Sequence, residues 1–239
     1  MKPLIAITGA SSGIGAAAAA SFSESGHPLL LLARRADRMA SLGLPNTIIA
    51  EVDVRDRAAL QDAVADAETQ YGPLDCLVNN AGLMQLGELA SQDPVEYEAM
   101  VGVNILGVLN GCSVALASMA EAGRGTIINV SSLAGRKAYP NHVAYVGTKF
   151  AVTGLTENLR QEVAGSNIRV SVVEPGAVET ELLGHTTSSD LISGYEQWKD
   201  SIGGALDADA VVRAIRYIYD QPQSVCIREV VLASTGQEG

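Results

Sequence analysis

The stretch TGASSGIG, residues 8–15, combines glycines and serines in a spacing that fits two different chemistries. Its GASSG portion at 9–13 matches the G-x-S-x-G pattern of a hydrolase nucleophile elbow, with Ser11 as the nucleophile. The glycines equally fit a turn that lets a dinucleotide pyrophosphate approach the backbone. Both interpretations need a strand before the stretch and a helix after it, so local context does not separate them.

Tyr145 and Lys149 form a second pair that could do chemistry, four residues apart in a segment, 142–164, that we predict to be helical. On a helix this spacing places both side chains on one face. A tyrosine has an ordinary pKa of about 10, and a nearby ammonium lowers the pKa by favouring the phenolate. The pair predicts a tyrosine that exchanges a proton with an alcohol or carbonyl oxygen. The alternative is an ordinary surface pair.

Short apolar runs that alternate with segments of helical length must position these residues. The runs lie at 4–7, 29–33, 47–52, 76–80, 126–132, 168–175 and 226–233, and the helical segments include 55–71 and 94–121. Several runs are apolar on both faces, as strands covered by helices on both sides should be. The pattern predicts an α/β protein over residues 1–239: a single-domain Rossmann fold whose doubly wound parallel sheet has about seven strands, with helices on both faces.

Composition restricts the class of partner. The 239-residue chain is 47% hydrophobic and has a net charge of −11, which argues against nucleic acid or an anionic membrane as a partner. Cys76, Cys112 and Cys226 are odd in number and lie among apolar neighbours, so we predict reduced, buried thiols and no metal site. The chain has neither a signal-peptide core nor a run of membrane-spanning length, which predicts a cytoplasmic protein.

The segment from Thr180 to about Leu206 interrupts the alternation with glycines, serines and threonines, together with Tyr195 and Trp198. A loop of this length in a compact domain is usually functional. It follows the sixth predicted strand, and open α/β sheets bind ligands at the carboxyl ends of their strands. We predict a substrate lid loop; the alternative is a decorated connection.

The later sequence separates the two interpretations of the glycine stretch. A nucleophile elbow needs an earlier strand–helix loop to supply its oxyanion donor, but Ser11 follows the first strand, so no such loop precedes it. The elbow also needs a later histidine as the base, and neither His142 nor His185 lies in a segment that marks it as one. Arg34 and Arg35 end the second strand, where NAD-binding folds usually carry an acidic residue for the ribose 2′-hydroxyl. Two guanidiniums there favour the 2′-phosphate of NADP. The alternative is that they begin a solvated helix.

Together these features resemble the short-chain dehydrogenases/reductases, whose cofactor turn is spaced G-x-x-x-G-x-G. The family's other motifs follow in order: Asn79-Asn80-Ala81-Gly82, Asn104 in a helix, Ser132, Tyr145-x-x-x-Lys149, and Pro175-Gly176. The resemblance covers essentially the whole chain. It implies an NADP-dependent oxidoreductase that interconverts a carbonyl and an alcohol by hydride transfer.

The resemblance also assigns roles to residues. It implies that Ser132 bonds the substrate oxygen, Tyr145 exchanges the proton, Lys149 also bonds the nicotinamide ribose, and Asn104 supports a water path to Lys149. The cofactor-binding residues that it implies are Gly9, Ser11, Ser12, Gly13, Ile14, Gly15, Arg34, Arg35, Asp53, Val54, Asn80, Ala81, Gly82, Tyr145, Lys149, Pro175, Gly176, Val178 and Thr180. Many NADP-using relatives carry a basic residue at the place of Ser12, so phosphate recognition here is expected to rest on Arg34, joined by Arg35.

Substrate and assembly are also expectations from the resemblance. The closing segments resemble a subgroup that acts on 3-hydroxy acids such as serine and on small functionalised aldehydes. Arg136 and Lys137 precede Tyr145 and could reach a substrate carboxylate or sulfonate, or they could be solvated loop charges. The family is usually a homotetramer that pairs the helices at about 94–120 and 142–164. A non-catalytic NADP-binding regulator and, third, a serine hydrolase are the alternatives.

Overall fold

Parallel strands form one sheet through the centre of the protein, in the order β3-β2-β1-β4-β5-β6-β7. The computed structural model describes residues 2–238. Its strands are β1 Leu4–Thr8, β2 Leu29–Ala33, β3 Thr47–Glu51, β4 Leu74–Asn79, β5 Gly125–Val130, β6 Ile168–Pro175 and β7 Glu229–Leu232. The strand order reverses between β1 and β4, which opens a ligand crevice at their carboxyl ends. The predicted doubly wound parallel sheet is confirmed.

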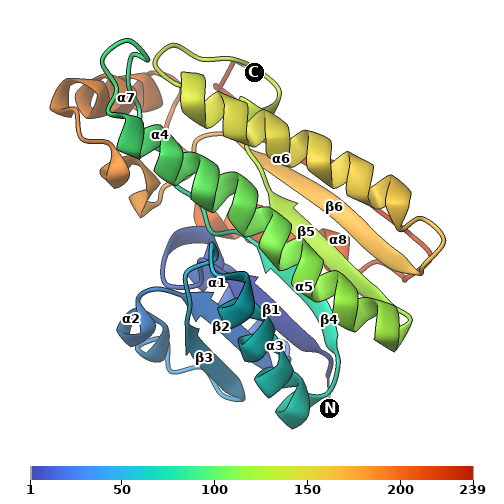
Figure 1. Cartoon of the computed structure of the whole chain (residues 1–239). Coiled ribbons are helices and arrows are strands. Elements are labelled where there is room, and N and C mark those ends of the chain that lie inside the picture. Colours follow the sequence, from blue (N-terminus) through green and yellow to red (C-terminus); the bar gives the residue numbers. More distant parts are fainter. Residues whose placement is uncertain (1, 239) are drawn as a thin grey trace.

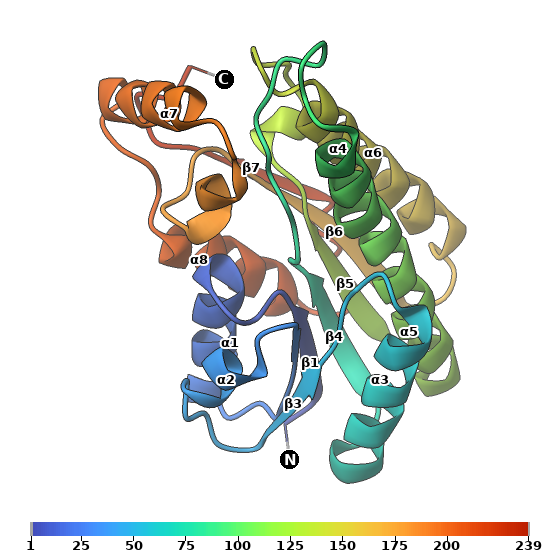
Figure 2. The same cartoon turned by 60° about the vertical axis from the view of Figure 1, so that its left-hand side comes forward.

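Helices cover both faces of this sheet, and Figure 2 shows the three layers from the side. The helices on one face are α1 Gly13–Glu24, α2 Ala36–Ala40 and α8 Ala208–Tyr219; those on the other are α3 Arg57–Tyr71, α4 Pro94–Val101, α5 Gly107–Ala122 and α6 Val143–Glu162. Each face has its own apolar core, built around Phe22 and Leu31 on one side and Leu30 and Leu60 on the other. The double covering explains why β1, β2 and β4 are buried at every position.

A π-helical turn, Gly102–Leu106, joins α4 to α5 into one long apolar helix (Figure 1). Within the described chain, the stretch Pro94–Ala122 is the helix that could cross a membrane by length and composition. Half of its most apolar window is buried in the fold, and α5 packs against β4 and β5. Its apolar composition is therefore that of a core helix.

The segment predicted as a lid loop is mostly helical, so the prediction of a loop was wrong. It contains the 3-10 helix η3, Glu181–His185, and α7, Ser189–Ser201. Ser188 caps α7 by accepting a hydrogen bond from Leu191 N, at 3.4 Å from that nitrogen. The segment leaves and returns at one place, because Leu206 pairs with the backbone of residues 177–179.

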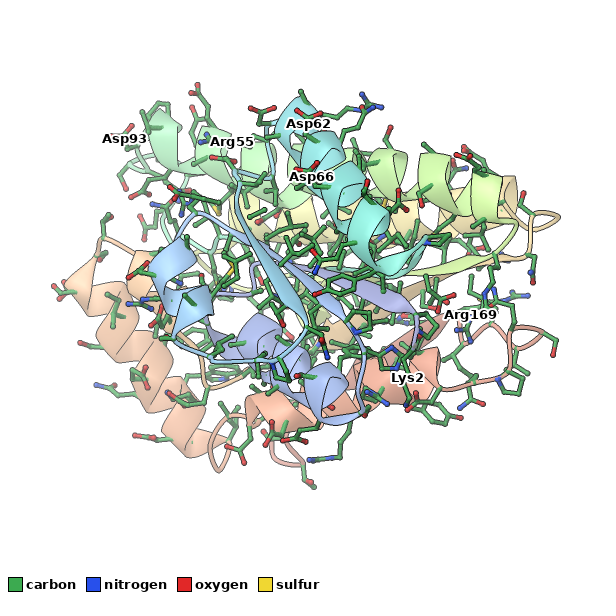
Figure 3. All side chains as sticks on the ribbon, turned by 90° about the horizontal axis from the view of Figure 1, so that it is seen from below. Lys2, Arg55, Asp62, Asp66, Asp93 and Arg169 are labelled. Carbon is green, nitrogen blue, oxygen red and sulfur yellow. The ribbon has the colours of Figure 1, made fainter. Side chains whose placement is uncertain are left out.

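The last strand begins later than predicted, at Glu229 rather than at residue 226. Cys226 therefore precedes β7 and is exposed, which contradicts the prediction of three buried thiols; Cys76 and Cys112 are buried, and all three are free. Arg169, labelled in Figure 3, is buried within β6 and donates hydrogen bonds to backbone carbonyls at the end of α8, including that of Tyr219 at 2.9 Å. This bond network ties α8 to the sheet.

Candidate active site

A cleft of about 660 Å³ lies at the carboxyl ends of the strands. Most residues expected to bind the cofactor or to act in catalysis line it: Gly9, Ser11, Ser12, Gly13, Ile14, Arg34, Arg35, Asp53, Val54, Asn80, Ala81, Gly82, Ser132, Tyr145, Lys149, Pro175, Gly176, Val178 and Thr180. Gly15 and Asn104 do not line the cleft; they contact lining residues, Gly15 the backbone of Gly9 and Asn104 that of Leu83. The strand ends gather positions that are up to 171 residues apart in sequence, such as Gly9 and Thr180.

The glycine turn connects β1 to α1 at one end of the cleft. Gly9 and Gly13 have φ values of +67° and +51°, a backbone region that favours glycine. A Cβ atom on Gly9 would lie 2.8 Å from Ala81 Cα, so the turn and the Asn80–Gly82 segment touch backbone to backbone. Asn80 fixes this contact by donating its side-chain amide to Thr8 O at 3.1 Å.

The start of α1 suits an anion. Ser12 is its N-cap residue, yet the Ser12 side chain makes no capping hydrogen bond, and no acidic residue lies in the first turn. The first N–H groups of the helix are therefore left for a ligand, and the helix dipole favours negative charge there. Thr180 packs against the turn, since a Cβ atom on Gly13 would lie 2.9 Å from Thr180 Cγ2.

Arg35 is the cation that contacts this turn. Its guanidinium donates to Ser11 Oγ at 3.0 Å and to Ser12 Oγ at 2.9 Å. It also pairs with Glu181 of η3 at 2.9 Å, and Arg38 pairs with the same carboxylate. Arg34 is exposed and lines the cleft with no hydrogen bond of its own among the described contacts. The structure thus brings a guanidinium to Ser12, where the family resemblance led us to expect a basic side chain.

Asp53 lies on the loop after β3, beside Val54. Arg55, labelled in Figure 3, donates hydrogen bonds to the Asp53 carboxylate from Nε at 3.0 Å and from Nη2 at 2.6 Å. These bonds lower the pKa of Asp53. The cap of α3 is Asp56 instead, which accepts a hydrogen bond from Ala59 N at 3.0 Å. Asp53 is therefore free of the ordinary capping role and faces the cleft.

Ser132, Tyr145 and Lys149 come together at the other end of the cleft. Ser132 follows β5, and its Oγ accepts a hydrogen bond from Ala134 N at 3.1 Å. Tyr145 and Lys149 share one face of α6, with Lys149 Nζ 5.7 Å from the centroid of the Tyr145 ring. Both side chains are buried, and Lys149 Nζ donates to Val130 O at 3.0 Å.

Burial changes the proton affinity of both groups. It lowers the pKa of Lys149 to about 8, because the charged ammonium is desolvated. It raises the pKa of Tyr145, and a hydrogen bond with Ser132 opposes this rise. The pair is thus held where a proton can be exchanged with an oxygen of a ligand in the cleft.

Asn104 lies in the π-helical turn and joins two parts of the site. Its Oδ1 accepts from Leu83 N at 2.8 Å, and its Nδ2 donates to Leu83 O at 2.8 Å and to Thr148 Oγ1 at 3.0 Å. A Cβ atom on Gly82 would lie 3.5 Å from Asn104 Oδ1 and 3.8 Å from Lys149 Nζ. Asn104 therefore anchors the segment after β4 to α6, next to Lys149.

Arg136 and Lys137 do not line the cleft. The Arg136 guanidinium pairs with Glu174 at 3.0 Å and with Glu229, at the ends of β6 and β7. Glu174 is completely buried and also accepts a hydrogen bond from Thr153 at 2.6 Å. Arg136 thus compensates a buried carboxylate of the fold and lies outside the cleft lining.

Several lining residues had no signal in the sequence. Tyr139 and His142 precede α6, and Gln237 reaches the cleft from the C-terminal segment, where its Oε1 accepts from Ala177 N at 3.0 Å. Tyr195 and Trp198 of α7 complete this end of the cleft. Of these residues, only Tyr195 and Trp198 stood out in the sequence, as aromatic residues of the segment expected to form the lid.

Comparison with known proteins identifies the family. Residues 3–190 match the family model described as short chain dehydrogenase. An uncharacterized oxidoreductase of Staphylococcus saprophyticus is 37% identical over 240 residues, covering 98% of this chain and 96% of that protein. An NADP-dependent 3-hydroxy acid dehydrogenase of Salmonella typhi is 32% identical over 239 residues, covering 98% and 96%. The closed form of a serine dehydrogenase complexed with NADP⁺ has a TM-score of 0.92 at 29% identity, covering 99% of this chain and 96% of that chain. This protein therefore belongs to the short-chain dehydrogenase family of oxidoreductases, as its sequence motifs predicted.

Proposed function

We propose that this protein is an NADP(H)-dependent oxidoreductase that interconverts an aldehyde or ketone and the corresponding alcohol. The observation that carries the proposal is the placement of Ser132, Tyr145 and Lys149 together at one end of a cleft whose other end is an uncapped helix N-terminus. Such an arrangement can hold a dinucleotide by its pyrophosphate and a carbonyl oxygen beside a proton donor.

The cofactor residues fit NADP(H). The first N–H groups of α1 receive the pyrophosphate, and Arg35 with Arg34 receives the 2′-phosphate, for which guanidinium groups are suited. Asp53 and Val54 flank the adenine, and the small residues 80–82 allow the ribose to approach the backbone. Residues 175–180 orient the nicotinamide. Two relatives support this choice, since one is named NADP-dependent and the other is complexed with NADP⁺.

The reaction follows from the groups at the other end. The nicotinamide, when bound, supplies or accepts the hydride. Ser132 holds the substrate oxygen, and Tyr145 gives its proton to that oxygen in reduction or removes a proton in oxidation. Lys149 favours the Tyr145 phenolate, since its Nζ lies 5.7 Å from the ring centroid and a unit positive charge at such a distance contributes ~3 kcal/mol at an effective dielectric constant of ~20. Asn104 keeps the segment after β4 in place beside Lys149.

The test is to follow oxidation of NADPH by absorbance with a panel of aldehydes, ketones and keto acids. Tyr145→Phe should lower kcat by about 10²- to 10⁴-fold while NADPH still binds. Full activity of Tyr145→Phe would refute the assigned acid. Tight NADPH binding without turnover of any carbonyl would favour the non-catalytic regulator. Labelling of Ser11 by a serine-directed acylating probe would favour the hydrolase, although its Oγ accepts from Arg35 at 3.0 Å.

We also propose that the protein is a cytoplasmic homo-oligomer, with a tetramer favoured, and that it acts on small molecules and binds neither nucleic acid nor membrane. Exposed apolar side chains on the outer faces of the long helices support an oligomer: Val101, Leu106, Leu109, Val143 and Phe150. Light scattering coupled to gel filtration measures the assembly. A monomer at micromolar concentration would contradict the proposal.

A further inference from the structure

The end of the cleft beside Tyr145 is built from aromatic rings. The His142 ring lies 5.8 Å from that of Tyr139, 6.2 Å from that of Tyr145 and 6.3 Å from that of Tyr195. Tyr195 is in turn 5.1 Å from Trp198. Aliphatic side chains from the segment after β4 and from the lid pack with these rings: Leu83, Met84, Leu86, Leu182, Leu183 and Leu191. This end offers a substrate mainly apolar surface.

The lysines and arginines of the cleft lie at its cofactor end or already have partners. Arg35 contacts the glycine turn at the cofactor end, and Arg34, its exposed neighbour in sequence, makes no described hydrogen bond. Lys149 is buried and donates to Val130 O at 3.0 Å. Lys199 lies between two carboxylates, at 3.0 Å from Glu179 and 2.5 Å from Glu196. None of these cations is placed to receive an anionic group of a substrate beside Tyr145.

The histidines do not replace a missing cation. Burial lowers the pKa of His142, which keeps the imidazole neutral near pH 7. Its Nδ1 lies 2.6 Å from Pro140 O, so Nδ1 carries the proton and Nε2 is left as an acceptor. His185 is exposed, and its Nδ1 lies 3.1 Å from Leu182 O. His142 thus offers a hydrogen-bond acceptor to a ligand, which suits a hydroxyl and repels a carboxylate.

The charge of the cleft lining around α7 is negative. Glu179 and Glu196 pair with Lys199, and Asp190 adds a further carboxylate to this lining. Like charges at a binding surface disfavour a ligand of the same sign. A carboxylate or sulfonate placed on the aromatic surface would lose its hydration without a compensating cation, which disfavours its binding.

We propose that the substrate is an uncharged aldehyde or ketone bearing an apolar or aromatic group, and that a carboxylate or sulfonate on the substrate is rejected. This inference rests on the proposed carbonyl–alcohol activity and names its substrate class. It separates the protein from the relatives named for 3-hydroxy acids and for serine, whose substrates carry a carboxylate. Arg136, one of the two side chains that the sequence offered as an anchor for such a group, is held by Glu174 and Glu229 instead.

Matched substrate pairs test the proposal. Benzaldehyde is compared with 4-carboxybenzaldehyde, and methyl acetoacetate with acetoacetate, each with NADPH. We expect kcat/KM to be at least about tenfold higher for the neutral member of each pair, which corresponds to ~1.4 kcal/mol. Equal or faster turnover of the acids overturns the proposal.

A binding measurement keeps the inference distinct from the proposed activity. Trp198 is the only tryptophan of the chain and lines the cleft, so its fluorescence reports a bound ligand. Benzamide and 4-carbamoylbenzoate, which the enzyme cannot reduce, are titrated against the protein with NADP⁺ present. Tighter binding of benzamide supports the substrate class even if no carbonyl is turned over; equal or tighter binding of the anion overturns it.

Variants locate the selectivity. His142→Arg places a cation among the rings and should shift the acid-to-neutral ratio of kcat/KM toward the acid by at least about tenfold, with His142→Gln as the uncharged control. Arg136→Gln and Lys137→Gln change cations outside the cleft and should leave that ratio unchanged. A selective loss of acid turnover in either of these two variants would identify an anion anchor and refute the proposal.

Discussion

Arg35→Ala should separate NADPH from NADH more than any other single change in the cleft. The guanidinium lies at the glycine turn, 2.9 Å from Ser12 Oγ, and its side chain is 42% exposed. A charge-assisted hydrogen bond contributes about 1.5–3 kcal/mol. The phosphate must displace Glu181 from Arg35, and breaking an exposed ion pair of this kind costs ~0.5 kcal/mol of that energy. The remaining ~1–2.5 kcal/mol corresponds to about 5- to 70-fold weaker NADPH binding.

Fluorescence titration of the reduced nicotinamide measures Kd for both cofactors. NADH lacks the 2′-phosphate, so its Kd should change by no more than about twofold. Arg38→Ala is the matched control, because Arg38 shares Glu181 with Arg35 but does not line the cleft. Arg34→Ala should also weaken NADPH selectively, as the sequence predicts, but less than Arg35→Ala. Equal losses for NADPH and NADH in Arg35→Ala would show that Arg35 only supports the turn, and would refute the reasoning.

Three further substitutions test the electrostatic roles of Glu181, Lys149 and Arg136. Glu181→Gln removes the carboxylate that competes with the phosphate and should tighten NADPH binding by about two- to fivefold in calorimetry; weaker binding would contradict the exchange. Lys149→Met removes an ammonium that is charged below its pKa of about 8, so alcohol oxidation below pH 8 should fall and its pH profile should move to higher pH; an unmoved profile would exclude the ammonium's role. Arg136→Gln leaves Glu174 buried with its pKa raised further. The folded state then holds the Glu174 proton more tightly than the unfolded state does. The loss of folding stability in this variant, ~1–3 kcal/mol, should therefore grow as pH rises from 5 to 8. Thermal denaturation measures this loss, and a loss that shrinks over this range would refute the reasoning.

The sheet and the order of motifs were predictable because they depend on short-range patterns. Strands covered on both faces must be apolar at every position, and LLLLA at 29–33 is buried throughout. The glycine turn needs positive φ values, and the sequence marks Gly9 and Gly13 directly. Tyr145 and Lys149 needed only the helical spacing of four residues to share a face. For these features the local chemistry and the fold agree.

The predictions of a lid loop and of a last strand that begins at residue 226 failed for identifiable reasons. Glycine and serine in the lid suggested a loop, although Ser188 caps a helix whose Leu191, Tyr195 and Trp198 follow the helical period. Their partial burial depends on the aromatic partners before α6, which sequence does not place. The run at 226–233 is continuous in composition, but only Glu229–Leu232 pairs with β6. Pairing of this kind is a tertiary property.

Sequence also could not tell which arginine remains available for an anion, because availability depends on the partner of each guanidinium. Arg35 and Arg136 are both half-exposed, with side chains 42% and 46% accessible, and both pair with a glutamate. Glu181 is 51% exposed on a short 3-10 helix, so water can replace Arg35 at little cost when a phosphate arrives. Glu174 is wholly buried, and releasing Arg136 would leave its carboxylate without a cation in the interior. The first pair can exchange and the second cannot, which supports the proposed role of Arg35 in binding the phosphate and gives Arg136 a structural one.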